Sequence, residues 1–422
     1  MVIRPDLDEF MVEVRKHLPP GFDFEVTARV RGAFTRARGV KSATALFRLA
    51  LAFGGCGMSL RETCAWAAAA GLADLADTSL LERLCKAAPW LGDVVAELIA
   101  RQAQMPVGRW AGYRLRALDG TSICQPGADR TTWRLHVGYD LATGQADQIV
   151  LTDGRGAENL QRLVYRPGDI VLADRCYARP RDLRPVIAAG AHFIVRMGWN
   201  ALRLSKPDGT PFDLFAALAV QTAQEGEVPV RLDDGAAEEP LLLRLVIRRK
   251  SDEEAEVEKK RLIKDAKKRG KTPDPRSLQA AHYILLLTAL PASTFPAADV
   301  LALYRFRWQL ELAFKRMKSL AGLDQLAAKK PGLAQAWIYA RLIVFLIAEQ
   351  NAGQVPDSPP WGPDNAPRRP TKTRRQPVKT PIKSVTLAPD QNGIGQHPVQ
   401  HSRDLVMAKH LQCLHPHSPP HR

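Results

Sequence analysis

Apolar residues in the first quarter of the chain recur every three to four positions, the spacing of one face of an α-helix. This pattern predicts that residues 1–108 form a helical region. The expected helices are Asp6–His17, Ser42–Ala52, Leu60–Ala70, Ser79–Ala87 and Pro89–Gln102. Pro89 is placed at the start of the last helix because proline is tolerated in a first helical turn.

The turn at Gly71 joins two short, Ala-rich segments with the rhythm of a helix-turn-helix. We therefore expect residues 1–108 to bind DNA, although helix pairs of this kind also occur as ordinary packing units. Basic residues upstream of the turn are candidates for phosphate contacts: Arg29, Arg31, Arg36, Arg38 and Lys41.

After about residue 109 the apolar period changes to two, which indicates strands. Three consecutive strands are expected within residues 113–126, 132–144 and 146–156, with Gly and Asp at the turns. Helix and strand then alternate: a short helix Glu158–Leu163, a buried strand Asp169–Ala173, a helix within Pro180–Ala189 and a strand His192–Arg196. This order predicts an α/β fold with a sheet of mixed direction.

Residues 198–292 interrupt this pattern. Strands are expected at Leu241–Arg248 and His282–Leu287, around a charge-dense stretch, Arg249–Lys271, that reads as a solvated helix or a flexible excursion. We interpret the region as a β-rich insertion. A helix follows from about Ala298, and Leu333–Gln350 is a further apolar helix. Residues 351–422 are basic and Pro-rich without apolar periodicity, so they are predicted to be a disordered tail.

The 422 residues carry 60 Lys and Arg against 44 acidic residues, a formal net charge of +16. This excess favours a polyanionic partner such as nucleic acid, while a generic basic protein is the alternative. The six cysteines include no CxxC pair, which fits a reducing cytoplasm. Neither a signal peptide nor an uninterrupted apolar run of about 18 residues is apparent, so no membrane contact is expected.

The segment from Tyr304 to Lys318 contains neither Gly nor Pro and predicts one continuous helix. At about 100° per residue, Tyr304, Arg307, Glu311 and Lys318 fall on one narrow stripe. A carboxylate flanked by cations and a phenol is a plausible metal ligand within a phosphate-binding row. The alternative is a solvated stripe of mixed charge.

Two aspartates stand at the ends of predicted strands. Asp119 is followed by Gly120, and Asp174 follows the buried strand. A simple turn cap is the alternative for either residue, but neighbouring strands would bring both carboxylates together. With Glu311 on a helix packed against the sheet, three carboxylates would need cations to neutralise them. Two Mg²⁺ ions about 4 Å apart would do so and would supply phosphodiester chemistry.

These residues resemble the DDE triad of the insertion-sequence-4 family of bacterial transposases. The family signature Y-(2)-R-(3)-E-(6)-K is matched at every spacing by Tyr304, Arg307, Glu311 and Lys318. The surrounding segments DGT, WRLH, TDGRGAE and ADRCY are also similar to the family. The resemblance implies an RNase H-like catalytic core formed by residues 109–197 and 293–350, with residues 198–292 inserted before the glutamate helix.

The resemblance also implies the role of each residue. Asp119, Asp174 and Glu311 would bind two Mg²⁺ ions, for which Mn²⁺ would substitute, while Arg307 and Lys318 would grip DNA phosphates and Tyr304 would contact DNA near the cleaved strand. Further DNA-binding candidates are Arg175, Tyr177 and Trp199, with Trp308 as an alternative to Trp199. For each of these, ordinary packing is the competing explanation.

The expected function is a DNA transposase of the bacterial cytoplasm, associated with the nucleoid. It would bind the terminal inverted repeats as a synaptic homodimer, cut them and join the 3′-hydroxyl ends to target DNA. The alternatives are another metal-dependent nuclease of the same fold and a decayed or non-catalytic DNA-binding regulator. The tail departs from the family pattern, as an altered reading frame or a fusion scar would.

Overall fold

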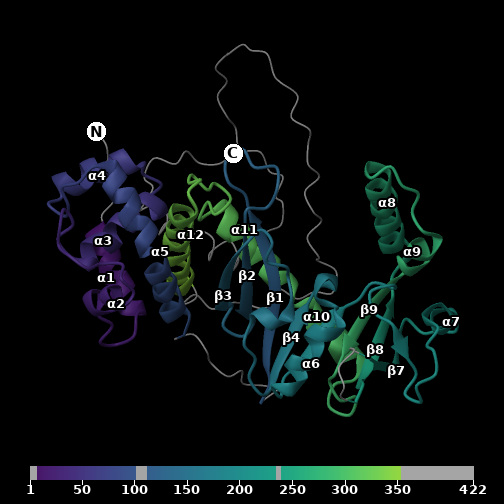
Figure 1. Cartoon of the computed structure of the whole chain (residues 1–422). Helices are drawn as coiled ribbons and strands as arrows, with labels where there is room; N and C mark the ends of the chain where they lie inside the picture. The colour runs from purple at the N-terminus through teal and green to yellow at the C-terminus, as the bar shows by residue number, and fades with distance from the viewer. Residues whose placement is uncertain (1–6, 101–111, 234–238, 353–422) are drawn as a thin grey trace, which may run out of the picture.

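The computed structural model describes residues 7–100, 112–233 and 239–352. They form a mixed α/β structure around one nine-stranded sheet, whose strand order is β3-β2-β1-β4-β5-β9-β8-β7-β6. Figure 1 shows a helical bundle beyond the β3 edge and a projecting helical arm, α8, near the other edge. The first two residues of the predicted tail, Asn351 and Ala352, are helical, and the rest of it lies outside the described residues, as does the end of the helix predicted at Pro89–Gln102.

The first five strands follow the predicted order along the chain. They are β1 Arg114–Ile123, β2 Trp133–Asp140, β3 Gln145–Asp153, β4 Asp169–Ala173 and β5 His192–Arg196. β1, β2 and β3 form the expected antiparallel succession. β4 pairs with β1 and β5 pairs with β4, both in parallel, so the sheet is of mixed direction as predicted.

The inserted strands extend this same sheet. They are β6 Leu204–Ser205, β7 Glu225–Leu232, β8 Leu241–Arg249 and β9 Tyr283–Thr288. β9 returns beside β5 in antiparallel register, with Val195 opposite Leu287, and β8 and β7 continue outward. Only β8 and β9 were expected. In β7, Pro229 and three acidic or basic side chains weaken the apolar alternation that sequence reading depends on.

The N-terminal region is helical, as predicted, but its boundaries differ. Its helices are α1 Leu7–His17, α2 Phe24–Val30, α3 Ala43–Ala50, α4 Leu60–Ala69 and α5 Asp77–Ala100, with a π turn at Leu51–Gly55. α2 was not predicted, although Asp23 caps it by accepting from two backbone N–H groups. Pro89 lies inside α5 instead of starting a new helix, because buried residues on both sides of it, including Leu84 and Trp90, hold one continuous helix.

The remaining helices are α6 Pro180–Ala188, α7 Leu214–Ala219, α8 Asp252–Lys268, α9 Pro275–Ala280, α10 Ala297–Arg305, α11 Trp308–Ser319 and α12 Pro331–Ala352. The short helix expected after Glu158 is a 3₁₀ turn, Leu160–Arg162. The charge-dense stretch does form a helix, α8, with a capping box between Ser251 and Glu254.

The continuous helix expected from Tyr304 to Lys318 is wrong. The chain tightens between α10 and α11, where Phe306 and Arg307 donate their backbone N–H groups to the carbonyls three residues back. Leu303 of α10 packs with the buried side of β4 and β5, whereas Leu310 of α11 packs with α5 and α12. Since the two apolar faces serve different core clusters, the helix axis must turn between them.

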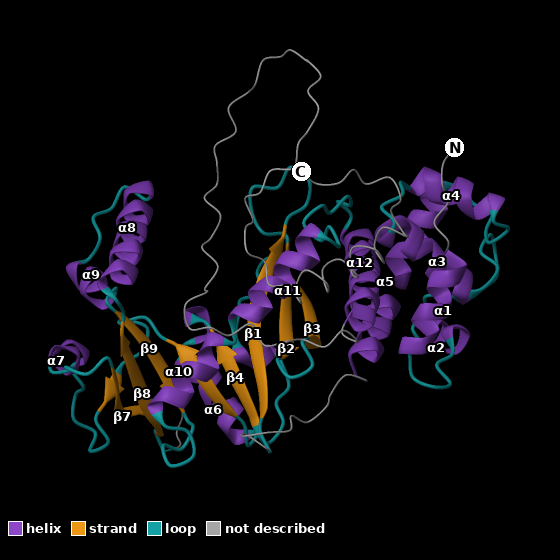
Figure 2. Ribbon diagram, turned by 180° about the vertical axis from the view of Figure 1, so that it is seen from behind, coloured by secondary structure: helices purple, strands orange, loops and turns teal. Residues whose placement is uncertain are grey.

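α12 is the central helix of the core that joins the N-terminal bundle to the sheet. It packs along α5, as Figures 1 and 2 both show, and its residues share one cluster with those of α11 and β1–β3. By length and composition, α12 is the one helix in the described ranges that could cross a membrane. However, 72% of its most apolar window is buried, as in a core helix.

Candidate active site

Strand pairing brings the two predicted aspartates together. β1 and β4 are parallel neighbours, and Leu118 lies opposite Ala173. Asp119 and Asp174 each follow directly, so they stand at the same level on adjacent strands. β4 ends at Ala173 while β1 continues beside β2, which leaves Asp174 in an open position at the sheet edge.

Each aspartate is oriented by a local backbone contact. Asp119 Oδ1 accepts from the N–H of Gly120 at 2.8 Å, and Asp174 Oδ1 accepts from the N–H of Cys176 at 2.7 Å. Burial raises the pKa of Asp119 to about 7, and the Asp174 carboxylate adds to the effect. A raised pKa from burial and a second carboxylate marks a site that favours a bound cation.

Arg307 connects the third carboxylate to this pair. Its Nη2 lies 2.6 Å from Glu311 Oε1, and its Nη1 lies 3.6 Å from Asp119 Oδ2. α11 is anchored by the buried Arg316, which donates to Tyr139 Oη at 3.2 Å and to Glu349 Oε1 at 3.1 Å. In this arrangement Arg307 supplies the positive charge that Asp119 and Glu311 share.

A carboxylate that sequence reasoning missed, Glu158, lies beside the same site. A Cβ atom added to Gly120 would stand 2.8 Å from Glu158 Cγ and Oε1, so the carboxylate packs directly over the glycine that follows Asp119. Burial raises the pKa of Glu158, with Arg134 opposing and Asp174 adding to the rise. The sequence signal for it is the TDGRGAE segment, whose glutamate is Glu158.

The segments WRLH and TDGRGAE hold Glu158 in place. Arg134 donates to the Gly156 carbonyl at 2.9 Å and lies 3.6 Å from Glu158 Oε1. A Cβ on Gly154 would stand 2.0 Å from the Thr131 carbonyl oxygen, so only glycine lets the loop approach β2 this closely. The two segments that resemble the transposase family thus position a carboxylate of the acidic site.

The other predicted DNA-binding residues occupy varied surroundings. Tyr304 is half-buried, with the Arg307 guanidinium 5.9 Å from its ring centroid. Lys318 is partly exposed on α11, about two turns beyond Glu311. Arg175 is exposed and lies 3.6 Å from Glu258 of α8.

Packing accounts for two further candidates. Tyr177 is 2% exposed and belongs to the core cluster that contains Leu118. Trp199 donates its indole N–H to Ser277 Oγ at 3.0 Å, and the guanidinium of Arg276 lies 4.4 Å from its ring centroid. A DNA base stacked on that face of Trp199 would have to displace Arg276. The DNA contacts of Tyr177 and Trp199 remain predictions.

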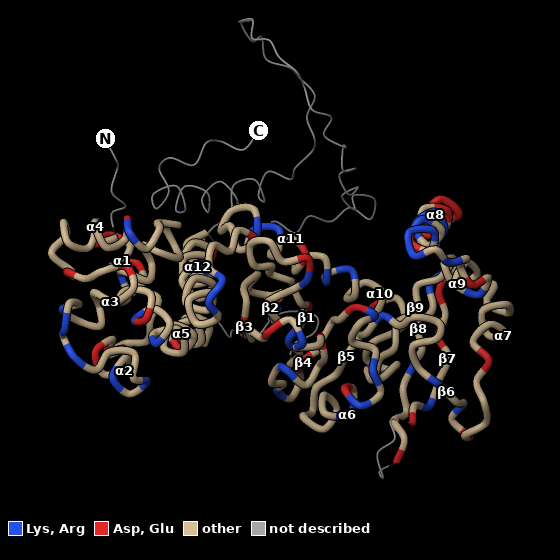
Figure 3. Tube along the Cα trace, turned by 45° about the horizontal axis from the view of Figure 1, so that its top comes forward, with Lys and Arg blue, Asp and Glu red and all other residues tan. Residues whose placement is uncertain are grey.

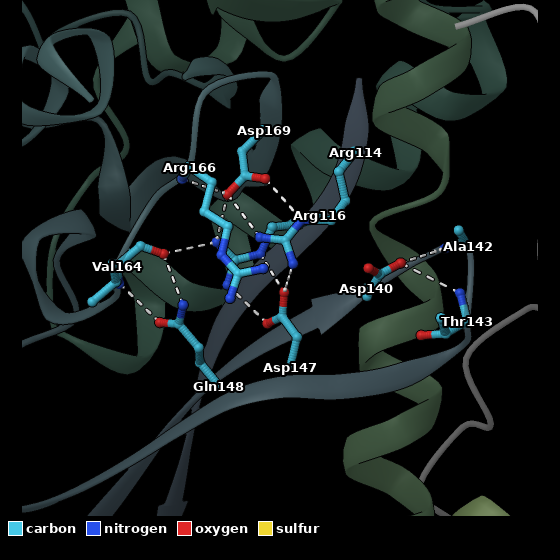
Figure 4. A network of polar contacts seen from close by, with 10 residues as sticks. All are labelled: Arg114, Arg116, Asp140, Ala142, Thr143, Asp147, Gln148, Val164, Arg166 and Asp169. Atoms are coloured by element: carbon cyan, nitrogen blue, oxygen red, sulfur yellow. Dashed lines mark hydrogen bonds and ion pairs between the residues drawn. The ribbon is translucent and has the colours of Figure 1, made fainter. Parts of the chain in front are cut away.

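A buried ion network fixes the strand register that the site depends on (Figure 4). Arg114 pairs with Asp169 across β1 and β4 at 2.8 and 2.9 Å, and Arg116 pairs with Asp147 of β3 at 2.5 and 2.8 Å. Arg116 also reaches Asp169 at 3.1 Å. A slip of one residue between β1 and β4 would break the pairs with Asp169 and would separate Asp119 from Asp174.

The donor set suits a divalent metal of the Mg²⁺ class, since every candidate ligand is a carboxylate oxygen. The burial and crowding that raise the pKa of Asp119 are costs that a bound cation would relieve. Across residues 7–100, 112–233 and 239–352, no three His, Cys, Asp or Glu side chains are gathered closely enough to hold one ion. Glu311, held by Arg307, would therefore have to move toward the two aspartates.

Comparison with known proteins supports the same chemistry. Residues 110–347 match the Transposase DDE domain family. The chain is 40% identical over 349 residues to InsL of Escherichia coli (strain K12), assigned as the transposase of insertion sequence element IS186A, covering 82% of this chain and 94% of that one. It is 39% identical over 350 residues to the transposase of insertion sequence element IS421 of Escherichia coli, with the same coverage.

More distant similarities extend to other elements. The transposase of insertion sequence element IS231F of Bacillus thuringiensis subsp. israelensis is 25% identical over 238 residues, 52% of this chain and 50% of that one. A solved structure of the piggyBac transposase synaptic complex with hairpin DNA aligns with a TM-score of 0.38 and 11% identity, covering 94% of this chain and 72% of that one. This last similarity is too weak to carry an argument. The domain match and the two relatives near 40% identity show that the chain belongs to the DDE transposase family, as a transposase of the insertion-sequence-4 type whose activity depends on a divalent metal.

Proposed function

We propose that Asp119, Asp174 and Glu311 are the metal-binding carboxylates of this transposase and that two Mg²⁺ ions bind with them. The observation that carries the proposal is the parallel register of β1 and β4, which sets the two aspartates side by side at an open strand end. The Arg307 bridge between Asp119 and Glu311 supports the inclusion of the glutamate.

The residues around the carboxylates have different roles in the proposed reaction. When bound, the metal would activate the attacking oxygen and stabilise the leaving oxygen of a phosphodiester. Arg307 offers a planar fork of donors that suits a phosphate as well as it suits Glu311. As DNA enters, Arg307 would turn to a phosphate and release both carboxylates. Lys318 and Tyr304 would hold the strand on either side of Glu311.

The same reading assigns the larger regions. β1–β5 with α10–α12 would be the RNase H-like core, and β6–β9 with α7–α9 the insertion. The N-terminal helices would bind terminal inverted repeats, a role supported by the exposed basic residues before the Gly71 turn: Arg36, Arg38 and Lys41. Much of α5, the second helix of that turn, is buried, so its recognition surface is limited to its exposed first turns. A synaptic homodimer would hold two element ends and the target.

The decisive experiment compares Asp174→Asn with Asp208→Asn, a control aspartate in an exposed turn of the insertion. Both variants would be tested with DNA carrying the element ends, in Mg²⁺ or Mn²⁺, for strand cleavage, 3′-end joining and end binding. We expect Asp174→Asn to bind the ends and fail to cut them, while Asp208→Asn behaves as the parent.

Other outcomes point to the competing functions. Normal cleavage by Asp174→Asn would refute the assignment of the metal site. Cleavage without joining by the parent would favour a nuclease of the same fold. End binding by the parent without any metal-dependent cleavage would favour a decayed enzyme acting as a regulator.

A further inference from the structure

The aspartates lie at the carboxyl ends of their strands, and a group of cations lies at the same end of the neighbouring strands. β5 and β8 are each antiparallel to β9, so both run in the direction of β1 and β4. Their carboxyl ends therefore point to the same edge as Asp119 and Asp174. Arg196 is the last residue of β5, Lys250 follows the end of β8, and Arg175 follows Asp174.

Helix α8 leaves this edge and places one carboxylate among the cations. Glu258 Oε1 lies 3.6 Å from Arg175 Nη2 and 3.4 Å from Arg261 Nη2. The contact with Arg175 joins α8 to the turn that holds Asp174, across more than 80 positions of sequence. The Glu258 side chain is only 17% exposed, although Figure 3 shows α8 as a projecting helix with charges of both signs.

The cations outnumber the carboxylate that pairs with them. Arg196 and Lys250 are half-buried, and Lys250 Nζ is held by the Ala281 carbonyl at 2.9 Å. Burial lowers the pKa of both groups, and a neighbouring guanidinium lowers each further: that of Arg175 for Arg196, and that of Arg196 for Lys250. Glu254, another carboxylate of α8, pairs with Arg248 at 3.0 Å.

We propose that Arg175, Arg196, Lys250 and Arg261 bind a backbone phosphate of the DNA strand, and that Glu258 holds the place of this phosphate in the DNA-free enzyme. A carboxylate and a phosphate accept the same forked hydrogen bonds from guanidinium groups. Binding of DNA would exchange one anion for another and would leave Glu258 free of Arg175. This inference rests on the proposed function, since it places the phosphate beside the proposed cleavage site.

The spacing along the edge fits a single strand of DNA. From β4 to β8 there are three strand intervals, about 14 Å in all at ~4.8 Å per interval. That span corresponds to about four nucleotides at 3.4 Å of rise per nucleotide. The strand would thus pass from the acidic site to the cations within a few nucleotides of the scissile phosphate, with α8 lying over it.

The test measures DNA binding by the full chain in EDTA, where cleavage does not occur. The probe is a labelled single strand of about 20 nucleotides unrelated to the element ends, followed by fluorescence anisotropy over a range of salt. Glu258→Gln removes the resident anion with little change in shape. Glu256→Gln is the matched control, because it removes the same charge from the same helix, where Glu256 pairs with Lys259 at 2.8 Å.

We expect Glu258→Gln to bind the probe about three- to tenfold more tightly than Glu256→Gln, which corresponds to roughly 0.7–1.4 kcal/mol. Arg261→Gln should bind more weakly than the parent, and its slope of log affinity against log salt should fall by about 0.7, the value for one lost phosphate contact on a single strand. Thermal unfolding of each variant checks that the fold is retained.

Equal affinities of Glu258→Gln and Glu256→Gln would overturn the proposal, and so would an unchanged salt slope in Arg261→Gln. Should Arg261→Gln fail to fold, the comparison of the two glutamate variants decides alone. The result is separable from the proposed catalytic function. A parent that never cuts element ends would refute that function while leaving this binding measurement intact, and normal cutting with no Glu258 effect would refute only the phosphate site.

Discussion

Two charged clusters lie on the same pair of strands and differ in how their charges are satisfied. At one end of β1 and β4, Arg114 and Arg116 pair with Asp147 and Asp169, and Arg116 is fully buried. About five residues further along lie Asp119 and Asp174, and there Arg307 pairs with Asp119 and with Glu311. The first cluster is closed, and the second is partly exposed.

The difference shows what each cluster contributes. In the closed network every carboxylate has two arginine partners, so it needs no further ligand. The network therefore serves to fix the strand register. In the acidic site there are more carboxylates than cations to neutralise them. Burial makes this excess negative charge costly. This cost falls at the point where a metal and a phosphate would enter, and the closed network keeps the two strands in the register that the acidic site needs.

The sharpest test of this comparison is to replace one aspartate in each cluster by asparagine. Asp119→Asn should reduce metal-dependent cleavage by at least about 1,000-fold, because losing ~4 kcal/mol of metal-derived stabilisation costs that factor. End binding should remain. A cleavage assay with the variant and with Asp129→Asn, an exposed loop aspartate, measures the effect. A loss smaller than tenfold would remove Asp119 from the metal ligands.

The converse change belongs to the closed network. Asp169→Asn leaves Asp147 as the one remaining carboxylate of this network for both Arg114 and Arg116, and removing one partner of a buried ion pair costs about 3–5 kcal/mol. We expect a matching loss in the free energy of unfolding by urea, again relative to Asp129→Asn. If Asp169→Asn unfolds like the parent, the network does not set the register, and the contrast between the two clusters fails.

Sequence reading reached the acidic site because its evidence is local. The alternation around Asp119 and the apolar run before Asp174 predicted two strand ends, and the spacing from Tyr304 to Lys318 identified the glutamate. Their neighbourhood in the sheet could only be stated as a condition, which the β1–β4 pairing now meets. Whether these residues are the ones that bind metal is still a prediction.

Features that depend on contacts between distant parts of the chain could not be predicted from the sequence. The turn between α10 and α11 arises because Leu303 and Leu310 pack into different clusters, while helix propensity favours continuity. The pairing of Arg114 and Arg116 with Asp147 and Asp169 could not be predicted, because these partners are distant in sequence. Glu158 was expected only to begin a short helix, and the packing of its carboxylate over Gly120 is what places it beside the acidic site.

The contact between Gly120 and Glu158 offers a milder perturbation of the acidic site. In Gly120→Ala the new methyl would stand 2.8 Å from the Glu158 carboxylate, so that side chain must shift. We expect cleavage to fall by about tenfold, or ~1.4 kcal/mol, through misplacement of the neighbouring Asp119. Adding Glu158→Ala should restore part of the rate by making room. Equal rates for Gly120→Ala with and without Glu158→Ala would show that the contact is unimportant.

The last expected effect is on stability, and its size depends on pH. Asp119 has a folded-state pKa of about 7 against an ordinary value of 3.8, chiefly because of burial. For such a raised pKa, the stability contributed by the protonated form is complete below about pH 4 and is lost as pH rises toward 7. Asp119→Asn should therefore match the parent near pH 4. Near pH 8, in EDTA, it should be more stable by on the order of 1–2 kcal/mol, after allowing for the lost pairing with Arg307.

Urea unfolding at the two pH values measures this difference, with Asp129→Asn as the control that should show none. Asp169→Asn should move the other way, since its carboxylate is fully paired. A higher free energy of unfolding in Asp119→Asn, together with a lower one in Asp169→Asn, would mean that the two clusters act oppositely on stability. The closed network would stabilise the fold, and the acidic site would destabilise it. A destabilised Asp119→Asn at pH 8 would instead show that the Arg307 pairing outweighs burial, and that the acidic site is a structural ion pair like its neighbour.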